Sequence, residues 1–385
     1  MGNCCTNESE GDQAMRGRPV TMKGAYATEY QQPQHIARQQ NPGFANKPDL
    51  KSYTPTTMSP NSMGMPSPTH YPPGFSPAMP AYIQNAERQP VMTQMPPGNH
   101  APDAKEAHPV PQLNPLSKEA EAMTKKLPAF NYSETVSVQS SCPDMGPYRF
   151  KDGCTYRGQF YAGRRHGRGR QVWKDGSVYE GYWMNDRCHG YGRVIHSDGE
   201  FYSGYWQDNK ADGKGEMGAK DGSSYTGKFR EDKKDGKGIE KLIDGSVYDG
   251  EFLKGLRHGE GKLVFATGQV YVGDFINGKI QGVGKMTWKD GRTYVGDFRD
   301  NKMHGRGEFS WTDGKKYVGN YQLDKKHGEG VMQWSDGSKY EGPFSQGKQH
   351  GDGIYTDSKG NCTRAFWEDG NITNIIQEQF AKKTA

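Results

Sequence analysis

Residues 294–316 read YVGDFRDNKMHGRGEFSWTDGKK, and this 23-residue unit decides the fold. It holds Tyr294 with a glycine at +2 and an aromatic residue at +4, then Gly305 and Gly307, then Trp311 and an Asp-Gly pair. Positions i, i+2 and i+4 of a strand share a face, so the first run places two rings on one face with a gap between them. The Gly-x-Gly run opens a second strand that ends on the tryptophan, and Asp-Gly is a tight-turn signal. The unit therefore predicts one β-hairpin.

The same unit recurs nine times without an insertion or deletion, and we number the repeats 1 to 9. A lone hairpin is marginal in water, so these hairpins must stack on one another. The tyrosines expected to stack are Tyr156, Tyr179, Tyr202, Tyr225, Tyr248, Tyr271, Tyr294, Tyr317 and Tyr340. The sequence thus predicts an all-β fold, an elongated single-layer stack of antiparallel β-hairpins.

The consensus Tyr-x-Gly-x-Phe/Trp, His-Gly-x-Gly and Asp-Gly resembles the MORN (membrane occupation and recognition nexus) repeat family over about residues 150–360. The resemblance implies arrays that serve at junctions of membrane and cytoskeleton, in ciliary or axonemal assemblies, or beside lipid kinases. It also implies protein partners, binding of anionic phospholipid and, in some arrays, homodimers.

Residues 1–147 are rich in Pro, Gln and Met and show no sustained hydrophobic period, which predicts a disordered arm. One short helix is expected inside it, over residues 116–126, with Asn114 as its N-cap and Pro115 at its first position. Leu127-Pro128 would end that helix.

The repeats and a degenerate cap are expected to fill residues 148–370, and a capping helix is expected over 371–385. This last stretch places Ile372, Ile375, Ile376 and Phe380 on one helical face. Terminal repeats need such caps, because their aromatic residues would otherwise be exposed.

The first residues, MGNCCT, fit the N-myristoylation pattern M-G-x-x-x-[ST]. Gly2 would carry the myristoyl group, and Cys4 and Cys5 lie close enough to carry palmitate. One myristoyl chain gives only reversible membrane binding, on the order of 10⁴ M⁻¹, whereas a second chain makes the anchor stable. The motif therefore predicts lipidation at Gly2, Cys4 and Cys5.

A basic cluster in repeat 1 is the best candidate surface for anionic headgroups or acidic partners. It consists of Arg164, Arg165, Arg168 and Arg170. Each basic residue near such a membrane contributes about 1 kcal/mol. The alternative is a solvated face with interspersed acids, such as Glu231 and Asp232, and the sequence does not decide between them.

The sequence offers no constellation typical of an enzyme. The Gly-x-Gly runs lack the third glycine of a dinucleotide-binding loop, and no nucleophile-elbow, Walker-type or kinase motif occurs. Histidines precede six of the Gly-x-Gly runs, yet no second ligand type accompanies each one, so we interpret them as packed histidines rather than metal ligands. We therefore expect no cofactor and no metal. No nucleic-acid partner is expected either, because a formal net charge of +5 over 385 residues is only mildly basic.

Together these features predict a non-catalytic scaffold that an N-terminal lipid tethers to a cytoplasmic membrane face. Its expected location is the inner face of the plasma or ciliary membrane, and its partners are proteins or anionic lipid. Two alternatives stay open: a soluble subunit of a cytoskeletal or ciliary assembly, recruited through the aromatic groove of the array, or a regulatory subunit of a lipid kinase acting in trans.

Overall fold

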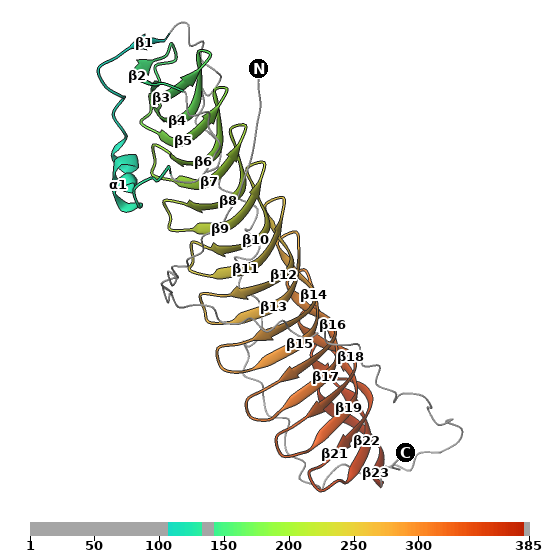
Figure 1. The fold of residues 1–385 in the computed structure, drawn as a ribbon. Helices are drawn as coiled ribbons and strands as arrows, with labels where there is room; N and C mark the ends of the chain where they lie inside the picture. The colour runs from blue at the N-terminus through green and yellow to red at the C-terminus, as the bar shows by residue number, and fades with distance from the viewer. Residues whose placement is uncertain (1–106, 133–141, 381–385) are drawn as a thin grey trace, which may run out of the picture. The chain divides into compact units, whose positions relative to one another are not determined.

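The computed structural model describes residues 107–132 and 142–380. Within these residues, one antiparallel sheet of 23 strands follows chain order, and one helix lies beside its first strands (Figure 1). The predicted all-β stack of antiparallel hairpins is confirmed. The elements are β1 (His108–Pro109), α1 (Lys118–Lys126), β2 (Asp144–Arg149), β3 (Thr155–Tyr161), β4 (Arg164–Val172), β5 (Val178–Met184), β6 (Arg187–Ile195), β7 (Phe201–Gln207), β8 (Lys210–Gly218), β9 (Ser224–Arg230), β10 (Lys233–Lys241), β11 (Val247–Leu253), β12 (Leu256–Val264), β13 (Val270–Ile276), β14 (Lys279–Thr287), β15 (Thr293–Arg299), β16 (Lys302–Ser310), β17 (Lys316–Gln322), β18 (Lys325–Gln333), β19 (Lys339–Ser345), β20 (Lys348–Gln349), β21 (Gly351–Thr356), β22 (Cys362–Glu368) and β23 (Asn371–Phe380).

Two kinds of turn alternate along the sheet. Within repeat 1, Ala162 and Gly163 both have positive φ, 49° and 75°, which is the mirror-type two-residue turn that matches strand twist. Between repeats, the Trp173 N–H donates to the Ser177 carbonyl at 2.9 Å, and Gly176 adopts a φ of 87°. The Asp-Gly pairs therefore lie in the turns that join one repeat to the next.

The second strand of each hairpin begins earlier than the sequence predicts. In repeat 1 it starts at Arg164, and Gly167 of the Gly-x-Gly run lies inside it with a φ of 76°. The register shifts here, since Gly158 faces Gly169 whereas Phe160 faces Arg165. Gly-x-Gly thus forms a β-bulge rather than a strand start, and bulges bend and twist a strand.

The N-terminal boundary of the array is also corrected. Residues 107–132 of the predicted disordered arm are structured, and β2 begins at Asp144, before residue 148. β1 pairs with β2, which therefore has a neighbour on both sides. The rest of the predicted arm lies outside the described residues.

Helix α1 begins three residues later than predicted, because Ser117 rather than Asn114 is the N-cap. The Ser117 hydroxyl accepts a hydrogen bond from the Ala120 N–H at 3.0 Å. Asn114 instead ties the segment to repeat 1: its Nδ2 donates to the Gly153 carbonyl at 2.9 Å, and its N–H donates to the Thr155 hydroxyl at 2.7 Å. The helix ends before Leu127-Pro128, as predicted.

The predicted C-terminal helix is wrong. Residues 371–380 form β23, which pairs antiparallel with β22. The free edge of the last hairpin offers backbone partners that a helix could not use, and β-branched isoleucines suit a strand. Ile372 still packs against the aromatic core, while Ile375 and Ile376 are exposed. Residues 381–385 lie outside the described part of the chain.

Candidate functional site

The inner face of the sheet carries the nine repeat tyrosines, which are at most 1% exposed. Each ring is held edge-on between two others. Tyr179 contacts Trp183 of its own repeat at a centroid distance of 5.1 Å and Trp206 of the next repeat at 5.6 Å. Such T-shaped pairs are each worth about 0.5–1.5 kcal/mol beyond the area they bury. The ladder therefore joins each repeat to the next.

The glycines of the two strands make room for the tyrosine of their own repeat. The Tyr179 hydroxyl donates to the Tyr182 carbonyl at 2.9 Å and lies over Gly181 and Gly192. Burial raises the pKa of Tyr179 well above its ordinary value. The gap predicted between the two rings of each repeat is thus already filled by the repeat's own tyrosine, and the tyrosine row offers no open aromatic groove for a partner.

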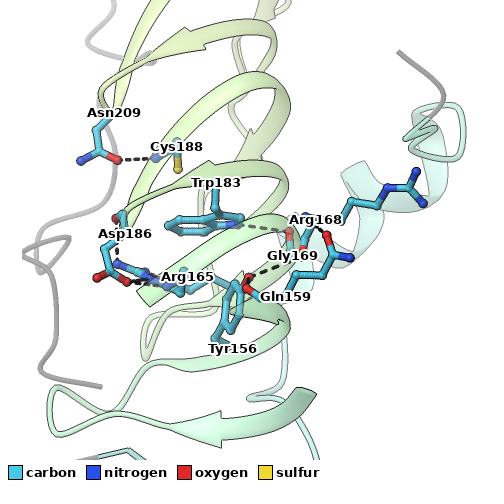
Figure 2. A network of polar contacts seen from close by, with 10 residues as sticks. Tyr156, Gln159, Arg165, Arg168, Gly169, Trp183, Asp186, Cys188 and Asn209 are labelled. Atoms are coloured by element: carbon cyan, nitrogen blue, oxygen red, sulfur yellow. Dashed lines mark hydrogen bonds and ion pairs between the residues drawn. The ribbon is translucent and has the colours of Figure 1, made fainter. Parts of the chain in front are cut away.

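The basic cluster of repeat 1 does not form one exposed patch. Arg165 is fully buried, and its Nε donates to Asp186 Oδ1 at 3.1 Å, as Figure 2 shows. Its guanidinium also lies 4.3 Å from the centre of the Trp183 ring. Arg165 is therefore a core residue and cannot meet a headgroup. Arg164 and Arg168 are exposed and Arg170 is half-buried.

The outer face, opposite the tyrosines, carries an apolar cluster at its N-terminal end. We call this set the apolar quartet; it consists of Val172, Val178, Ile195 and Phe201, which are at most 8% exposed. Residues 113–127 cover it, with Ala120 of α1 completely buried. Four further residues of the segment pack against this cluster, namely Leu113, Leu116, Met123 and Leu127.

An aromatic surface beside the quartet holds the next residues of the same segment. We call Tyr182 and Tyr191 the aromatic shelf. The Phe130 ring stacks on Tyr191 at 5.6 Å, and the Tyr132 ring meets Tyr182 edge-on at 5.8 Å. The Tyr182 hydroxyl donates to the Tyr132 carbonyl. Residues 113–132, the docked segment, thus lie across repeats 1 and 2.

Two arginines hold the extended end of the docked segment. Arg193 donates to the Pro128 carbonyl at 2.8 Å, and its guanidinium lies 5.6 Å from the Phe130 ring centre. Arg168, from the predicted basic cluster, lies 5.8 Å from the Tyr132 ring centre. In this structure Arg168 therefore contacts the chain's own docked segment.

The outer face loses this apolar character further along the array. The residue pairs Val172/Val178 and Ile195/Phe201 face each other across strands in repeats 1 and 2. The equivalent pairs in repeats 3, 4, 6, 7 and 8 each contain at least one small or polar residue, and only repeat 5 repeats a valine pair. These pairs are Gly218/Ser224, Lys241/Val247, Val264/Val270, Thr287/Thr293, Ser310/Lys316 and Gln333/Lys339. A fully apolar surface next to an aromatic shelf therefore marks repeats 1 and 2.

The remaining predicted groups have the following places. Histidines at His166, His189 and His304 have buried Nδ1 atoms without a hydrogen-bond partner, and the described residues contain no cluster of three potential metal ligands.

The cysteines at 142, 154, 188 and 362 are buried free thiols, and burial raises the pKa of Cys154 to about 12. Gly2, Cys4 and Cys5 lie outside the described residues. No helix in the described ranges is long and apolar enough to span a membrane.

These observations define a tandem-repeat protein with a continuous β-sheet, a class that serves as scaffold rather than as a known type of enzyme. A sequence model of the MORN repeat matches nine consecutive segments, residues 156–178, 179–201, 202–224, 225–247, 248–270, 271–291, 294–316, 317–339 and 340–362. The chain therefore belongs to the MORN-repeat family.

Other comparisons add little. No curated protein sequence matches the chain. The TCP10 domain of Danio rerio CPAP, solved with a peptide of STIL, is 11% identical, with 60% of this chain and 97% of that domain covered at a TM-score of 0.35. The SAS-4 (dCPAP) TCP domain of Drosophila melanogaster, solved with a proline-rich motif of Ana2, is 11% identical over 51% of this chain and 99% of that domain at a TM-score of 0.27. Because both TM-scores lie below 0.5, neither likeness carries an argument about this chain.

Proposed function

We propose that this chain is a non-catalytic scaffold. Acyl groups on Gly2, Cys4 and Cys5 hold it at a cytoplasmic membrane face, and the outer face of its array recruits protein partners. The observation that carries the second part is the docked segment, since repeats 1 and 2 already bind a polypeptide through apolar, aromatic and hydrogen-bonding contacts.

The anchor is supported by the sequence and by membrane thermodynamics. The MGNCCT motif offers one amide site and two thiol sites within its first five residues. Two acyl chains give stable binding where one gives only reversible binding. Direct lipid binding by the array has less support, because Arg165 is buried and Arg168 faces the docked segment.

A membrane-partition assay in cells tests the anchor. Wild type is compared with Gly2→Ala and with Cys4→Ser/Cys5→Ser, and Cys362→Ser serves as the matched control because that thiol is buried in the array. Both N-terminal variants should move to the soluble fraction while the control stays in the pellet. Retention of both N-terminal variants would support a cytoskeletal or ciliary subunit instead. A lipid-kinase activity that co-purifies with the chain, and that the isolated chain lacks, would favour the regulatory-subunit alternative.

A further inference from the structure

We propose that the apolar quartet and the aromatic shelf form a binding site for a helical segment of a partner protein, and that residues 113–132 occupy this site as an internal competitor. The proposal rests on the scaffold function above and names the chemistry of the partner. That partner presents an amphipathic helix followed directly by an extended stretch with two aromatic residues.

The helical part of the ligand is defined by the spacing of the docked segment. Leu116, Ala120, Met123 and Leu127 follow one another at intervals of four, three and four; Ala120 and Met123 lie in α1, Leu116 directly precedes its N-cap and Leu127 is its C-cap. This is the period of one helix face. Ala120 is completely buried in the same cluster as the quartet, so a partner helix needs a small residue there.

The extended part of the ligand is defined by the aromatic shelf. Phe130 and Tyr132 are two residues apart, each packs on a tyrosine ring of repeat 2, and each has an arginine beside it. Stacking and cation–π contacts of this kind favour aromatic side chains over aliphatic ones. A matching partner therefore carries aromatic residues with the same two-residue spacing.

The array itself places this site in repeats 1 and 2. The repeats share one consensus, but only repeat 2 combines an apolar pair, Ile195 and Phe201, with tyrosines at both shelf positions, and the Val172/Val178 pair of repeat 1 lies next to it. In repeat 7 the quartet positions are occupied by Ser310 and Lys316, and both are half-buried rather than covered. Such a local departure from the repeat pattern indicates a surface shaped for one ligand.

The docked segment is held in a way that permits exchange. Helix α1 has nine residues, fewer than the roughly 12–15 that an isolated helix needs in water, so it depends on the face that it covers. Its sequence KEAEAMTKK leaves most of its polar side chains exposed. A short connection between segment and array corresponds to an effective concentration in the mM range, which a longer or more apolar helix in trans can match.

A peptide-binding measurement on the full-length chain tests the proposal. The probe is a fluorescein-labelled peptide of residues 107–132 in which the lysines at 118, 125 and 126, which are exposed, are replaced by glutamine. Wild type is compared with the opened variant Leu116→Asp/Leu127→Asp. Ile195→Asp in the opened variant removes the quartet, and Ser310→Asp at the equivalent position of repeat 7 is the matched control.

The opened variant should bind the peptide at least tenfold more tightly than wild type does. Ile195→Asp should abolish that binding and Ser310→Asp should leave it unchanged. Equal affinity for wild type and opened variant would overturn the proposal, as would no binding to an opened variant with the wild-type circular dichroism spectrum.

A second measurement needs no variant of the chain. Excess unlabelled peptide should raise the rate at which trypsin cleaves wild-type chain after Lys125 and Lys126, because the released helix becomes a substrate. An unchanged rate at saturating peptide would overturn the proposal even if the opened variant failed to fold. Neither measurement depends on acylation, so a failure here leaves the membrane-partition result to stand alone.

Discussion

The Tyr179 hydroxyl lies 2.1 Å from the point that a β-carbon on Gly192 would occupy. The side chain of one residue thus requires the absence of a side chain on the other, and the ring of Tyr179 is completely buried between the strands. The same relationship joins each repeat tyrosine to the second glycine of its Gly-x-Gly run, for example Tyr317 to Gly330 at 2.4 Å. The tyrosine and the Gly-x-Gly positions of the consensus therefore pack together as one unit.

Gly192→Ala should destabilise the array strongly. The added methyl would force the Tyr179 ring out of the ladder, and overpacking of a tight core costs about 1–3 kcal/mol or more. Gly245→Ala is the control: Gly245 has a φ of 88° with no atom within 4 Å of an added β-carbon, so only backbone strain of roughly 1–2 kcal/mol is expected. Urea denaturation followed by circular dichroism measures both. A smaller loss for Gly192→Ala than for Gly245→Ala would contradict the packing unit.

The Arg165–Asp186 pair should tolerate joint replacement better than single replacement. Asp186→Ala leaves a buried guanidinium without its carboxylate and removes the acceptor for the Arg165 N–H, which should cost about 3–5 kcal/mol. Repeat 2 shows how an apolar residue fills the same place, since Cys188 donates its N–H to Asn209 Oδ1 at 2.7 Å. The double variant Arg165→Met/Asp186→Asn should therefore recover most of the loss in a thermal melt. A double variant as unstable as the sum of its parts would argue against this exchange.

The largely buried carboxylate of Glu240, whose side chain is 17% exposed, should make the array sensitive to acid. Burial alone would raise its pKa, but Lys234 at 2.5 Å and Arg257 at 2.8 Å hold the pKa below its ordinary value of 4.5. A depressed carboxylate pKa contributes stability above pH 4.5 that is lost as the pH falls through the folded-state pKa. Glu240→Gln should cost about 3 kcal/mol at pH 7 and much less near pH 3. Glu231→Gln, at an exposed pair with Lys210, should change stability by less than about 0.5 kcal/mol at either pH.

Lys326 should make stability rise with pH as well, but on the alkaline side. Its ammonium lies among the rings of Trp311, Tyr317 and Phe344, and burial, with a smaller contribution from Lys315, lowers its pKa from 10.5 to about 8. Since the unfolded chain binds the proton more tightly, stability should rise between pH 8 and about 10, by at most about 1.4 kcal/mol per pH unit. Lys326→Met should be more stable than wild type at pH 7 and should lose this rise. If the stability of wild type and of Lys326→Met rose with the same slope over this pH range, groups other than Lys326 would be responsible.

Much of this architecture follows from the sequence because one period governs it. The 23-residue step of Tyr156 and its eight equivalents predicts hairpins, turns and the buried ladder from backbone geometry alone. Burial of Arg165 could not be predicted in the same way, because the equivalent position holds Cys188, Lys234 or Ile280 in other repeats. These side chains differ in size and charge, so the repeat pattern does not indicate how each one is packed.

The two ends of the array were harder to predict. The isoleucines of β23 fit a helical face and a strand equally well, and the open edge of β22 decides between them. The docked segment carried a signal in the spacing of Leu113, Leu116, Met123 and Leu127. That signal lies in a Pro- and Gln-rich context, and the surface that receives it exists only after the hairpins have stacked.

The unbroken step of 23 residues has a consequence for distances. From β3 to β19, each hairpin pairs only with the hairpins before and after it, so the backbone pairing of the repeats crosses one boundary at a time. Gaining or losing one unit would shift everything beyond it by about 10 Å, from two strands at roughly 4.8 Å each, without altering any local packing. The number of repeats therefore sets the length of the array. Two partners bound at its two ends would be held at a separation that changes only in steps of one repeat.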